Sequence, residues 1–419
     1  MKKANICGLA LCLLGTSSQL IAGNGSVYSR FGVGDIVTYS SSRTAAMGGA
    51  GVALLTDGYI NSSNPATLSL LTRTQYSADF QYQGYGMNDG TESSFLNSGN
   101  IQSAMLAFPV YDKVKLAMAF GLTPFSQTAY NVRDAETEAG QDIIQIFDGK
   151  GGLSSAQVSF SLSPLQDFYL GATLHYIFGE FDYRQQLEYA GAGYFATDED
   201  KIVSLEGFGY TLGGAFAGID GALGLSKEKQ LTVAATLFTG AAMDSKEQRI
   251  ENFITSKETT SVAYGTAKLP LGIVLGLEYH PNEKLLFTGD AKFQQWGNYT
   301  YFGAHPSEIR NSSRFGVGTE FAPTLSLGES YFRQVTYRAG SYMNASYLAL
   351  NGEQIKEYFV TAGIGIPLFF SPGSEARLNI GVEYGIRGTT SNGLQRDRIT
   401  RLTISLSGSD TWFNPPEVE

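Results

Sequence analysis

The sequence predicts an all-β protein, a roughly 14-stranded antiparallel transmembrane β-barrel with an N-terminal hatch, a plug of short helices, inside the lumen. Three observations predict it: segments of alternating apolar and polar residues, connectors of alternating length, and a non-alternating segment before the first strand. The composition agrees, because only 16% of the 419 residues are charged, whereas 24 are Tyr and 26 are Phe. A mean hydropathy of -0.08 is too low for a helical membrane protein.

The N-terminus has the layout of a secretory signal peptide. Two lysines precede an apolar stretch over residues 6–14, and small and polar residues follow up to Ala22. Both cysteines, Cys7 and Cys12, lie in this segment, so the mature chain is expected to have neither a disulfide nor a cysteine metal site. Neither cysteine follows a small residue, which makes a lipoprotein the less favoured alternative.

Alternation with period two predicts the strands, because successive strand side chains point to opposite faces. It is clearest over residues 377–387, where Leu378, Ile380 and Val382 share one face, opposite charged and amide side chains. The predicted strands are 74–87, 99–110, 113–125, 153–164, 167–181, 204–219, 229–241, 260–279, 284–299, 311–323, 333–343, 356–369, 375–388 and 396–408.

The connectors between these strands alternate in length. Outer-membrane barrels have even strand numbers, short periplasmic turns and long extracellular loops. The pattern therefore favours a barrel in the bacterial outer membrane, with both chain ends in the periplasm, over a soluble sandwich. The predicted long loops are 88–98, 126–152, 182–203 and 242–259, and the predicted short turns are 111–112, 165–166 and 281–283.

The segment before the first strand does not alternate and is rich in Gly, Ser, Ala and Asn. Asn64 is placed to cap a short helix whose first residue is Pro65. The segment is too apolar for a free tail and too small to fold alone, so we expect it to fill the lumen. The predicted division is a signal peptide (1–22), a hatch (23–73), a transmembrane barrel (74–413) and a C-terminal tail (414–419).

This segment resembles the hatch of the FadL/TodX-type outer-membrane transporters, which carry long-chain fatty acids or other hydrophobic compounds. The resemblance implies a plugged 14-stranded barrel, entry from an extracellular groove, and lateral exit through a gap at a kinked third strand. The residues that carry the resemblance are the run Ser-Arg-Phe-Gly at 29–32, the run Ala-Met-Gly-Gly-Ala-Gly-Val-Ala at 46–53, Asp57, and Asn-Pro-Ala at 64–66.

The resemblance assigns roles to residues of the hatch and of the third strand. Gly121 and Pro124 in strand 113–125 become candidates for the lateral opening, because proline in a ladder removes a donor. The alternative is that Pro124 only ends the strand. The expected hatch and gate residues are Gly48, Gly49, Gly51, Asn64, Pro65 and Ala66.

Two further groups of residues are candidates for contact with a ligand. Apolar residues of the long loops are expected to capture it: Ile143, Ile144, Ile146, Phe147, Tyr194 and Phe195. A polar cluster is expected to face the lumen, either as a salt-bridged wall that holds the plug or as a site for an anionic headgroup: Arg314, Glu320, Arg338, Glu383, Arg387 and Arg401.

No catalytic constellation is present, so the sequence predicts neither an enzyme nor a cofactor nor a metal site. The net charge of -10 without a basic run argues against nucleic acid. Passive uptake of hydrophobic compounds is the favoured function. An accessory subunit of an outer-membrane protein secretion system is the alternative, and a water-filled porin is a weaker one. The expected partners are outer-membrane lipids and lipopolysaccharide, a hydrophobic small molecule, and the barrel-assembly machinery during biogenesis, for a monomeric barrel.

Overall fold

The computed structural model describes residues 25–410 except 38–40, 91–92, 139–140, 190–196, 220–229, 254–255, 324–329 and 372–373. The predicted signal peptide and C-terminal tail therefore lie outside the described residues.

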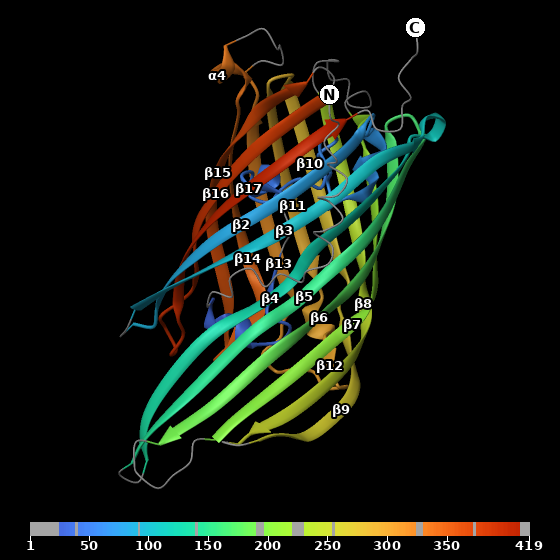
Figure 1. Cartoon of the computed structure of the whole chain (residues 1–419). Helices are drawn as coiled ribbons and strands as arrows, with labels where there is room; N and C mark the ends of the chain where they lie inside the picture. The colour runs from blue at the N-terminus through green and yellow to red at the C-terminus, as the bar shows by residue number, and fades with distance from the viewer. Residues whose placement is uncertain are drawn as a thin grey trace, which may run out of the picture.

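The chain folds into a closed antiparallel β-barrel (Figure 1). Most strands pair with their neighbours in sequence, and β17 (Arg396–Asp410) closes the ring by pairing with β2 (Thr74–Asn88) along its whole length. The other wall strands are β3 (Ser93–Tyr111), β4 (Leu116–Glu138), β5 (Gln141–Leu165), β6 (Phe168–Tyr189), β7 (Thr197–Phe216), β8 (Gln230–Asn252), β9 (Lys257–Leu269), β10 (Gly272–Asn282), β11 (Leu285–Gln294), β13 (Ser312–Phe321), β14 (Thr336–Leu350), β15 (Glu353–Ser371) and β16 (Ser374–Gly388).

The wall has 14 strand positions, as predicted. The strand predicted at 260–279 is interrupted, because Pro270 has no N–H to donate to a ladder. It therefore forms two strands, β9 and β10, which pair with successive parts of β8 and share one position. The two-residue strands β1 (Asp35–Ile36) and β12 (Thr300–Tyr301) add no position to the wall.

The long loops predicted at 126–152, 182–203 and 242–259 are wrong, because paired strands occupy most of these residues. For example, β4 and β5 remain paired as far as Glu138 and Gln141. Six strands thus continue beyond the rest of the wall, toward the lower end of Figure 1. We call this part the extension: 127–138 of β4, 141–152 of β5, 180–189 of β6, 197–204 of β7, 246–252 of β8 and 257–264 of β9.

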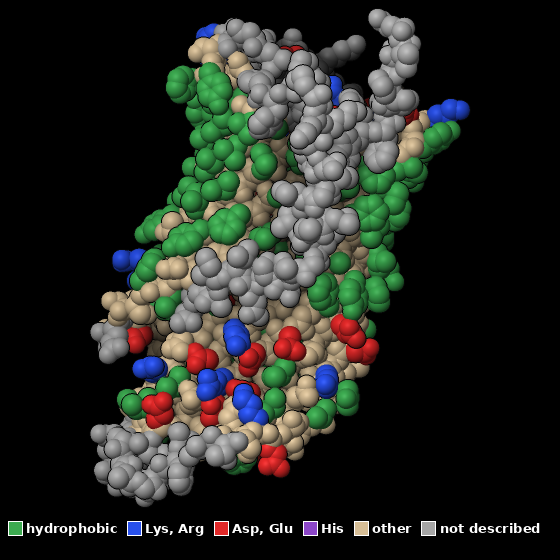
Figure 2. Space-filling model, in the orientation of Figure 1, with side chains coloured by type: hydrophobic (Ala, Val, Ile, Leu, Met, Phe, Trp, Pro, Cys, Tyr) green, Lys and Arg blue, Asp and Glu red, His purple; other side chains and the backbone are tan. Residues whose placement is uncertain are grey.

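Apolar side chains face outward on the barrel wall. Tyr82, Leu212 and Val360 are exposed there, and Figure 2 shows hydrophobic side chains over the upper part of the visible face, with charged side chains gathered near the lower end. An apolar outer band is typical of a barrel that crosses a membrane. Among the described residues, the helices are all too short or too polar to traverse a bilayer.

Residues 25–73, the N-terminal segment, pack against the inward face of the wall. They form η1 (Val27–Arg30), β1, α2 (Ser42–Ala45) and η2 (Pro65–Leu70), and most of their apolar side chains are buried. Glycines in the wall make this close approach possible. A Cβ atom at Gly318 would lie 2.4 Å from the Met47 Cβ, and one at Gly171 would lie 2.5 Å from the Ala66 nitrogen.

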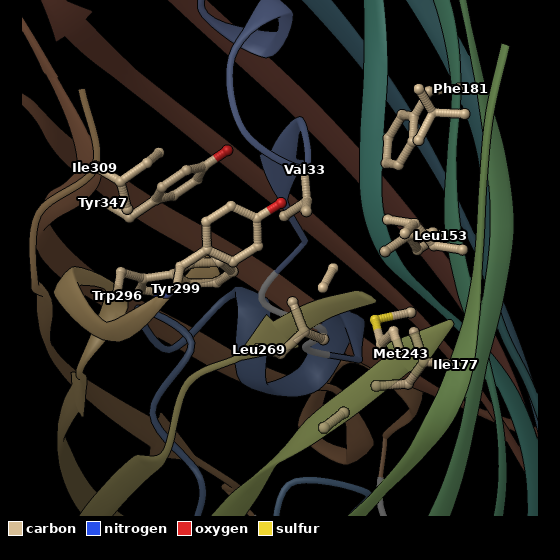
Figure 3. Packing of buried hydrophobic residues seen from close by; sticks show 14 residues of the cluster. Val33, Leu153, Ile177, Phe181, Met243, Leu269, Trp296, Tyr299, Ile309 and Tyr347 are labelled. Carbon is tan, nitrogen blue, oxygen red and sulfur yellow. The ribbon is translucent and has the colours of Figure 1, made fainter. Parts of the chain in front are cut away.

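One apolar cluster joins this segment to the wall. Val33 lies between the rings of Tyr299 and Tyr347 on one side and Leu153 on the other (Figure 3). Trp296, in η4 (Trp296–Asn298), stacks on Tyr347 with ring centroids 4.6 Å apart. The remaining short elements are η3 (Asp112–Val114) and α4 (Tyr331–Gln334).

Candidate functional site

A buried ion pair holds α2 against the wall. Arg43 donates to both carboxylate oxygens of Glu320 on β13, with Nε–Oε2 and Nη2–Oε1 distances of 2.9 and 2.8 Å. Arg338 on β14 donates to the same carboxylate at 2.6 Å. Such two-point contacts between guanidinium and carboxylate fix orientation as well as distance, so α2 has one defined position on β13 and β14.

The predicted gate glycines form the turn that follows α2. Gly48 and Gly49 have φ values of +70° and +71°, in the left-handed region that glycine tolerates best. The Gly48 N–H donates to the Thr361 hydroxyl at 3.0 Å. Asp290 of β11 accepts from the N–H groups of Gly51 and Val52 at 2.7 and 3.0 Å. Side chains of the wall thus satisfy the backbone of this turn.

Asn64, Pro65 and Ala66 lie against β6 and β7, remote from α2. The Asn64 Oδ1 accepts from the Ala66 N–H at 3.1 Å, which caps η2 as the sequence predicts. Its Nδ2 donates to the carbonyls of Val52 at 2.9 Å and Gly214 at 3.4 Å. One fully buried amide therefore joins two turns of the N-terminal segment to β7.

The six predicted polar residues face the lumen and fall into four groups, each with its own contacts. Glu320 and Arg338 belong to the ion pair with Arg43. Arg401 contacts Glu383 at 3.4 Å, and the Tyr342 hydroxyl donates to Glu383 at 2.9 Å.

Arg387 of β16 contacts three carboxylates, of which Glu357 of β15 is the most distant at 3.7 Å. Its Nη2 lies 3.0 Å from Asp397 of β17, and its Nη1 lies 2.9 Å from Asp35 of β1. Ser26 donates to the same Asp397 at 2.6 Å. The β16–β17 pair is therefore bound to the N-terminal segment at two places, Ser26 and Asp35.

Arg314 is the remaining predicted residue of the polar cluster. Its guanidinium carbon lies 3.9 Å from the ring centroid of Tyr342, and its Nη2 donates to the Gly48 carbonyl at 3.3 Å. Among the described residues, it has no ion pair with a carboxylate.

Gly121 and Pro124 lie where β4 separates from β3. The β3–β4 ladder ends at the pair Ala104–Leu122, although both strands continue. β4 keeps its other neighbour, since Pro124 is still opposite Ser154 of β5. A proline is tolerated at a strand edge because no partner there needs its N–H.

The N-terminal segment and amide side chains occupy this unpaired edge of β4. Ile36 of β1 pairs with Ser126. Gln127 accepts from the Asn100 amide of β3 at 3.0 Å, which bridges the separated strands through side chains.

The predicted capture residues do not form a loop. Ile143, Ile144, Ile146 and Phe147 belong to β5, where they pair with β4 and β6. Arg30 of η1 lies over the Phe147 ring, with the guanidinium carbon 4.4 Å from its centroid. Cross-strand pairs with β4 and β6 maintain the strand although its apolar residues do not alternate. Tyr194 and Phe195 lie outside the described residues.

A cavity of about 130 Å³ lies between the N-terminal segment and the wall. Its lining is mainly polar, whereas we expected apolar residues to contact the ligand. Most of the lining residues are amides and charged groups, and Trp296 and Tyr347 connect it to the apolar cluster of Figure 3. Its polar lining includes Gln81, Gln83, Gln102, Gln127, Asn344, Lys292, Arg314, Glu357, Glu383, Arg387 and Arg401.

Sequence reasoning missed several of the contacting residues. Asp290 and Lys292 alternate with apolar residues of β11, so register could have placed them in the lumen. Arg43 and Asp35 belong to a segment without periodicity, and no local signal identifies their wall partners.

A comparison with protein families identifies the family of this chain. A model of the BamG family matches residues 1–417. The chain belongs to the BamG family. No curated protein matches the sequence.

Solved structures share the fold of this BamG-family chain at low sequence identity. A Pseudomonas aeruginosa FadL homologue has a TM-score of 0.60 at 13% identity, covering 90% of this chain and 99% of its own. The Ralstonia pickettii toluene transporter TbuX has a TM-score of 0.59 at 14% identity, covering 88% and 98%. The Pseudomonas putida toluene transporter TodX has a TM-score of 0.55 at 16% identity, covering 91% and 100%. The resemblance to FadL/TodX-type barrels is thus confirmed for the fold.

Proposed function

We propose that this BamG-family protein is an outer-membrane transport barrel for hydrophobic compounds that carry a polar end, such as long-chain fatty acids. In this proposal residues 1–22 direct export, residues 23–73 act as a hatch, and residues 74–413 form the transmembrane wall. The ligand moves between the lumen and the lipid through the side of the barrel.

One observation carries the proposal: the internal cavity extends to both sides of the place where β3 and β4 are unpaired. Gln102 of β3 and Gln127 of β4 both line it, and the ladder between these strands has already ended at Ala104–Leu122. A closed barrel otherwise has no unpaired edge. This interruption offers a lateral route that needs no break in the β3–β4 ladder.

The polar lining limits the class of compound that fits. An amide-lined opening stabilises a charged or hydroxylated headgroup, whereas an alkyl chain gains about 25 cal/mol per Å² of apolar surface that leaves water. A molecule with its headgroup in the opening and its chain in the lipid satisfies both requirements. A purely apolar solute would leave buried amides without partners, at a cost of about 1–3 kcal/mol each.

The structure of the unpaired edge suggests β1 as the moving part. β1 pairs with β4 over only two residues, Asp35–Gln127 and Ile36–Ser126. Elements with few backbone bonds open at low free-energy cost. Asn64, Pro65 and Ala66 would remain against β6 and β7 while β1 leaves the edge, so the proposed gate is the first part of the hatch.

A disulfide between β1 and β4 tests this gate. Ile36 and Ser126 are directly opposite and flank the bonded pair Val37–Phe125, a geometry suited to a cross-link. We expect cells with Ile36→Cys/Ser126→Cys to lose uptake of a fluorescent long-chain fatty acid under oxidising conditions and to recover it on reduction. The control pair Ile380→Cys/Ile404→Cys, within the β16–β17 ladder, should change nothing. Unchanged uptake in the oxidised test variant, with the cross-link verified by mass, would refute the proposal.

A second function, an accessory subunit that binds another outer-membrane protein, is favoured by one feature of the extension. Residues 257–264 of β9 pair with β8 on one side, and no other described strand pairs with them on the other. The side chains of Val262 and Tyr264 are 45% and 77% exposed. An open edge of this kind accepts an added strand from a partner.

Site-specific cross-linking distinguishes the two functions. A photo-reactive residue at position 262 should capture one defined membrane-complex subunit if the accessory role holds, and Val262→Pro should abolish the complex without altering uptake. A reactive residue at position 380, in the middle of the wall, is the control. Absence of capture at 262, with uptake that depends on the β1 gate, leaves transport as the function.

A further inference from the structure

Two of the four cations that line the internal cavity are paired with carboxylates. Arg387 is within 3.0 Å of Asp397 and 2.9 Å of Asp35, and Arg401 lies 3.4 Å from Glu383. Glu357 of β15 also lies 3.7 Å from Arg387, so the carboxylates of this set outnumber its cations and both arginines are engaged.

Lys292 and Arg314 differ, because no carboxylate pairs with either of them among the described residues. Lys292 lines the cavity from β11 and makes no hydrogen bond or ion pair with the described part of the chain. Arg314 of β13 is its direct cross-strand partner. Two cations are therefore neighbours on one wall of the cavity.

One carboxylate on the same face of β11 does not pair with Lys292. Asp290 lies two residues earlier on β11, and its Oδ2 accepts from the N–H groups of Gly51 and Val52. It influences Arg314 electrostatically, but it forms an ion pair with neither cation. An unpaired ammonium held beside a guanidinium and away from bulk water is unfavourable unless an anion joins them.

The surroundings of the two cations fit the rest of an amphipathic anion. Tyr342 lies beneath the Arg314 guanidinium and fixes its plane, which leaves its edge available for an oxyanion. Trp296 lines the same cavity and belongs to the apolar cluster of Figure 3. A headgroup and the start of an apolar chain can thus be accommodated together.

We propose that Lys292 and Arg314 form a binding site for an oxyanion, a carboxylate or a phosphate group, inside the barrel. The inference rests on the proposed function and deepens it, since it assigns a charge to the polar end of the transported compound. Lys292 supplies a point charge, and Arg314 supplies two donors in a fixed plane.

Ligand titration of the full-length barrel in a neutral detergent tests the site, with the fluorescence of Trp296 as the readout. Trp412, the second tryptophan, is replaced by Phe in every sample. The probes are octanoate, inorganic phosphate and the neutral analogue octanol. We expect an oxyanion to bind and octanol not to bind measurably.

Substitutions identify the residues that bind. Lys292→Met should weaken binding about tenfold or more, because it removes a desolvated charge contact. Lys292→Arg should retain binding and shows that the fold is intact, and Lys257→Met, on the exposed extension, should have no effect. Tighter binding of octanoate than phosphate identifies a lipid headgroup as the source, and the reverse order identifies free phosphate. Failure of both anions to bind, or equal affinity in Lys292→Met, overturns the inference.

The outcome is separable from that of the proposed transport function. If octanoate binds through Lys292 while the Ile36–Ser126 disulfide leaves uptake unchanged, the site stands and lateral transport fails. If the disulfide blocks uptake while Lys292→Met binds normally, transport stands and this site fails.

Discussion

Arg43 and Glu320, separated by 277 residues in sequence, meet in a two-point ion pair inside the barrel. Arg338 contacts the same carboxylate, so Glu320 balances two guanidinium groups that belong to different parts of the molecule. The N-terminal segment is therefore fastened to the wall by electrostatics in a place where water has little access.

Removing Arg43 should loosen the N-terminal segment. Breaking one partner of a buried pair costs about 3 kcal/mol or more, although Arg338 would still compensate Glu320. We expect Arg43→Met to raise single-channel conductance in planar bilayers above that of the wild type. Arg184→Met, which breaks an exposed pair with Asp198 on the extension, is the matched control and should leave conductance unchanged. Equal conductance for the two variants would contradict a restraining role for Arg43.

Asn64 should contribute more than an ordinary helix cap. Asn64→Ala removes a cap and two further hydrogen bonds from a fully buried position, with an expected loss of about 1–3 kcal/mol. Asn64→Asp should be worse, because a carboxylate cannot donate to the carbonyls of Val52 and Gly214. Amide hydrogen exchange over residues 64–70 checks this order. Faster exchange in Asn64→Ala than in Asn64→Asp would show that the donated bonds matter little.

Two adjacent glycines of β7 should respond differently to the same substitution. A Cβ atom at Gly213 would lie 2.2 Å from the Asn64 Oδ1, whereas one at Gly214 would have 3.8 Å to its nearest neighbour. Gly213→Ala should therefore lower the temperature at which the barrel unfolds, measured as the loss of the fast-migrating folded band in gel electrophoresis. Gly214→Ala should leave this temperature unchanged. Identical transitions would mean that η2 is free to move away from the wall.

The extension should be sensitive to acid through Asp198. Its hydrogen bond with Arg184 holds the pKa of the Asp198 carboxyl below its ordinary value of 3.8. Because the folded state favours the ionised form, this contribution is complete above the ordinary pKa and is lost as the pH falls through the lowered one.

Hydrogen-exchange protection of residues 183–187, measured between pH 7 and pH 3, should reveal that loss. Asp198→Asn should reduce protection already at pH 7 and flatten the pH dependence. Asp182→Asn, in a more exposed pair with Lys150, should change less. An unaltered pH profile in Asp198→Asn would exclude this carboxyl as the source.

The barrel was predictable wherever one face is apolar and the other polar, as in β16. Glu383 and Arg387 could be placed in the lumen from the sequence, because Tyr384 and Ile386, which alternate with them, point outward. The extension was not predictable, because its outer part, such as residues 257–264, is exposed on both faces and lacks alternation. Two-residue β1 gives no periodic signal, and its position on β4 follows from tertiary contacts alone.

The candidate site was only partly visible for the same reason. Arg314 was identified by its register, but its lack of a carboxylate partner depends on what lies across the lumen. The sequence does not single out Lys292 as unpaired, since an inward lysine on a strand ordinarily has an acidic neighbour. Its isolation follows from Asp290 being engaged by the backbone of Gly51 and Val52.

The contacts at the β16–β17 pair constrain the order in which the molecule can be built. The last strand, β17, presents Asp397 to Ser26, and Gln395, directly before this strand, accepts from the Tyr28 hydroxyl. β17 must also join β2. Threading residues 25–73 into a finished cylinder would require desolvating these groups one by one along a crowded passage. Closure around an N-terminal segment already in place avoids that barrier. Residues 25–73 thus serve as a template around which β17 closes the barrel. A chain that lacks them should fail to close, with β2 and β17 left unpaired.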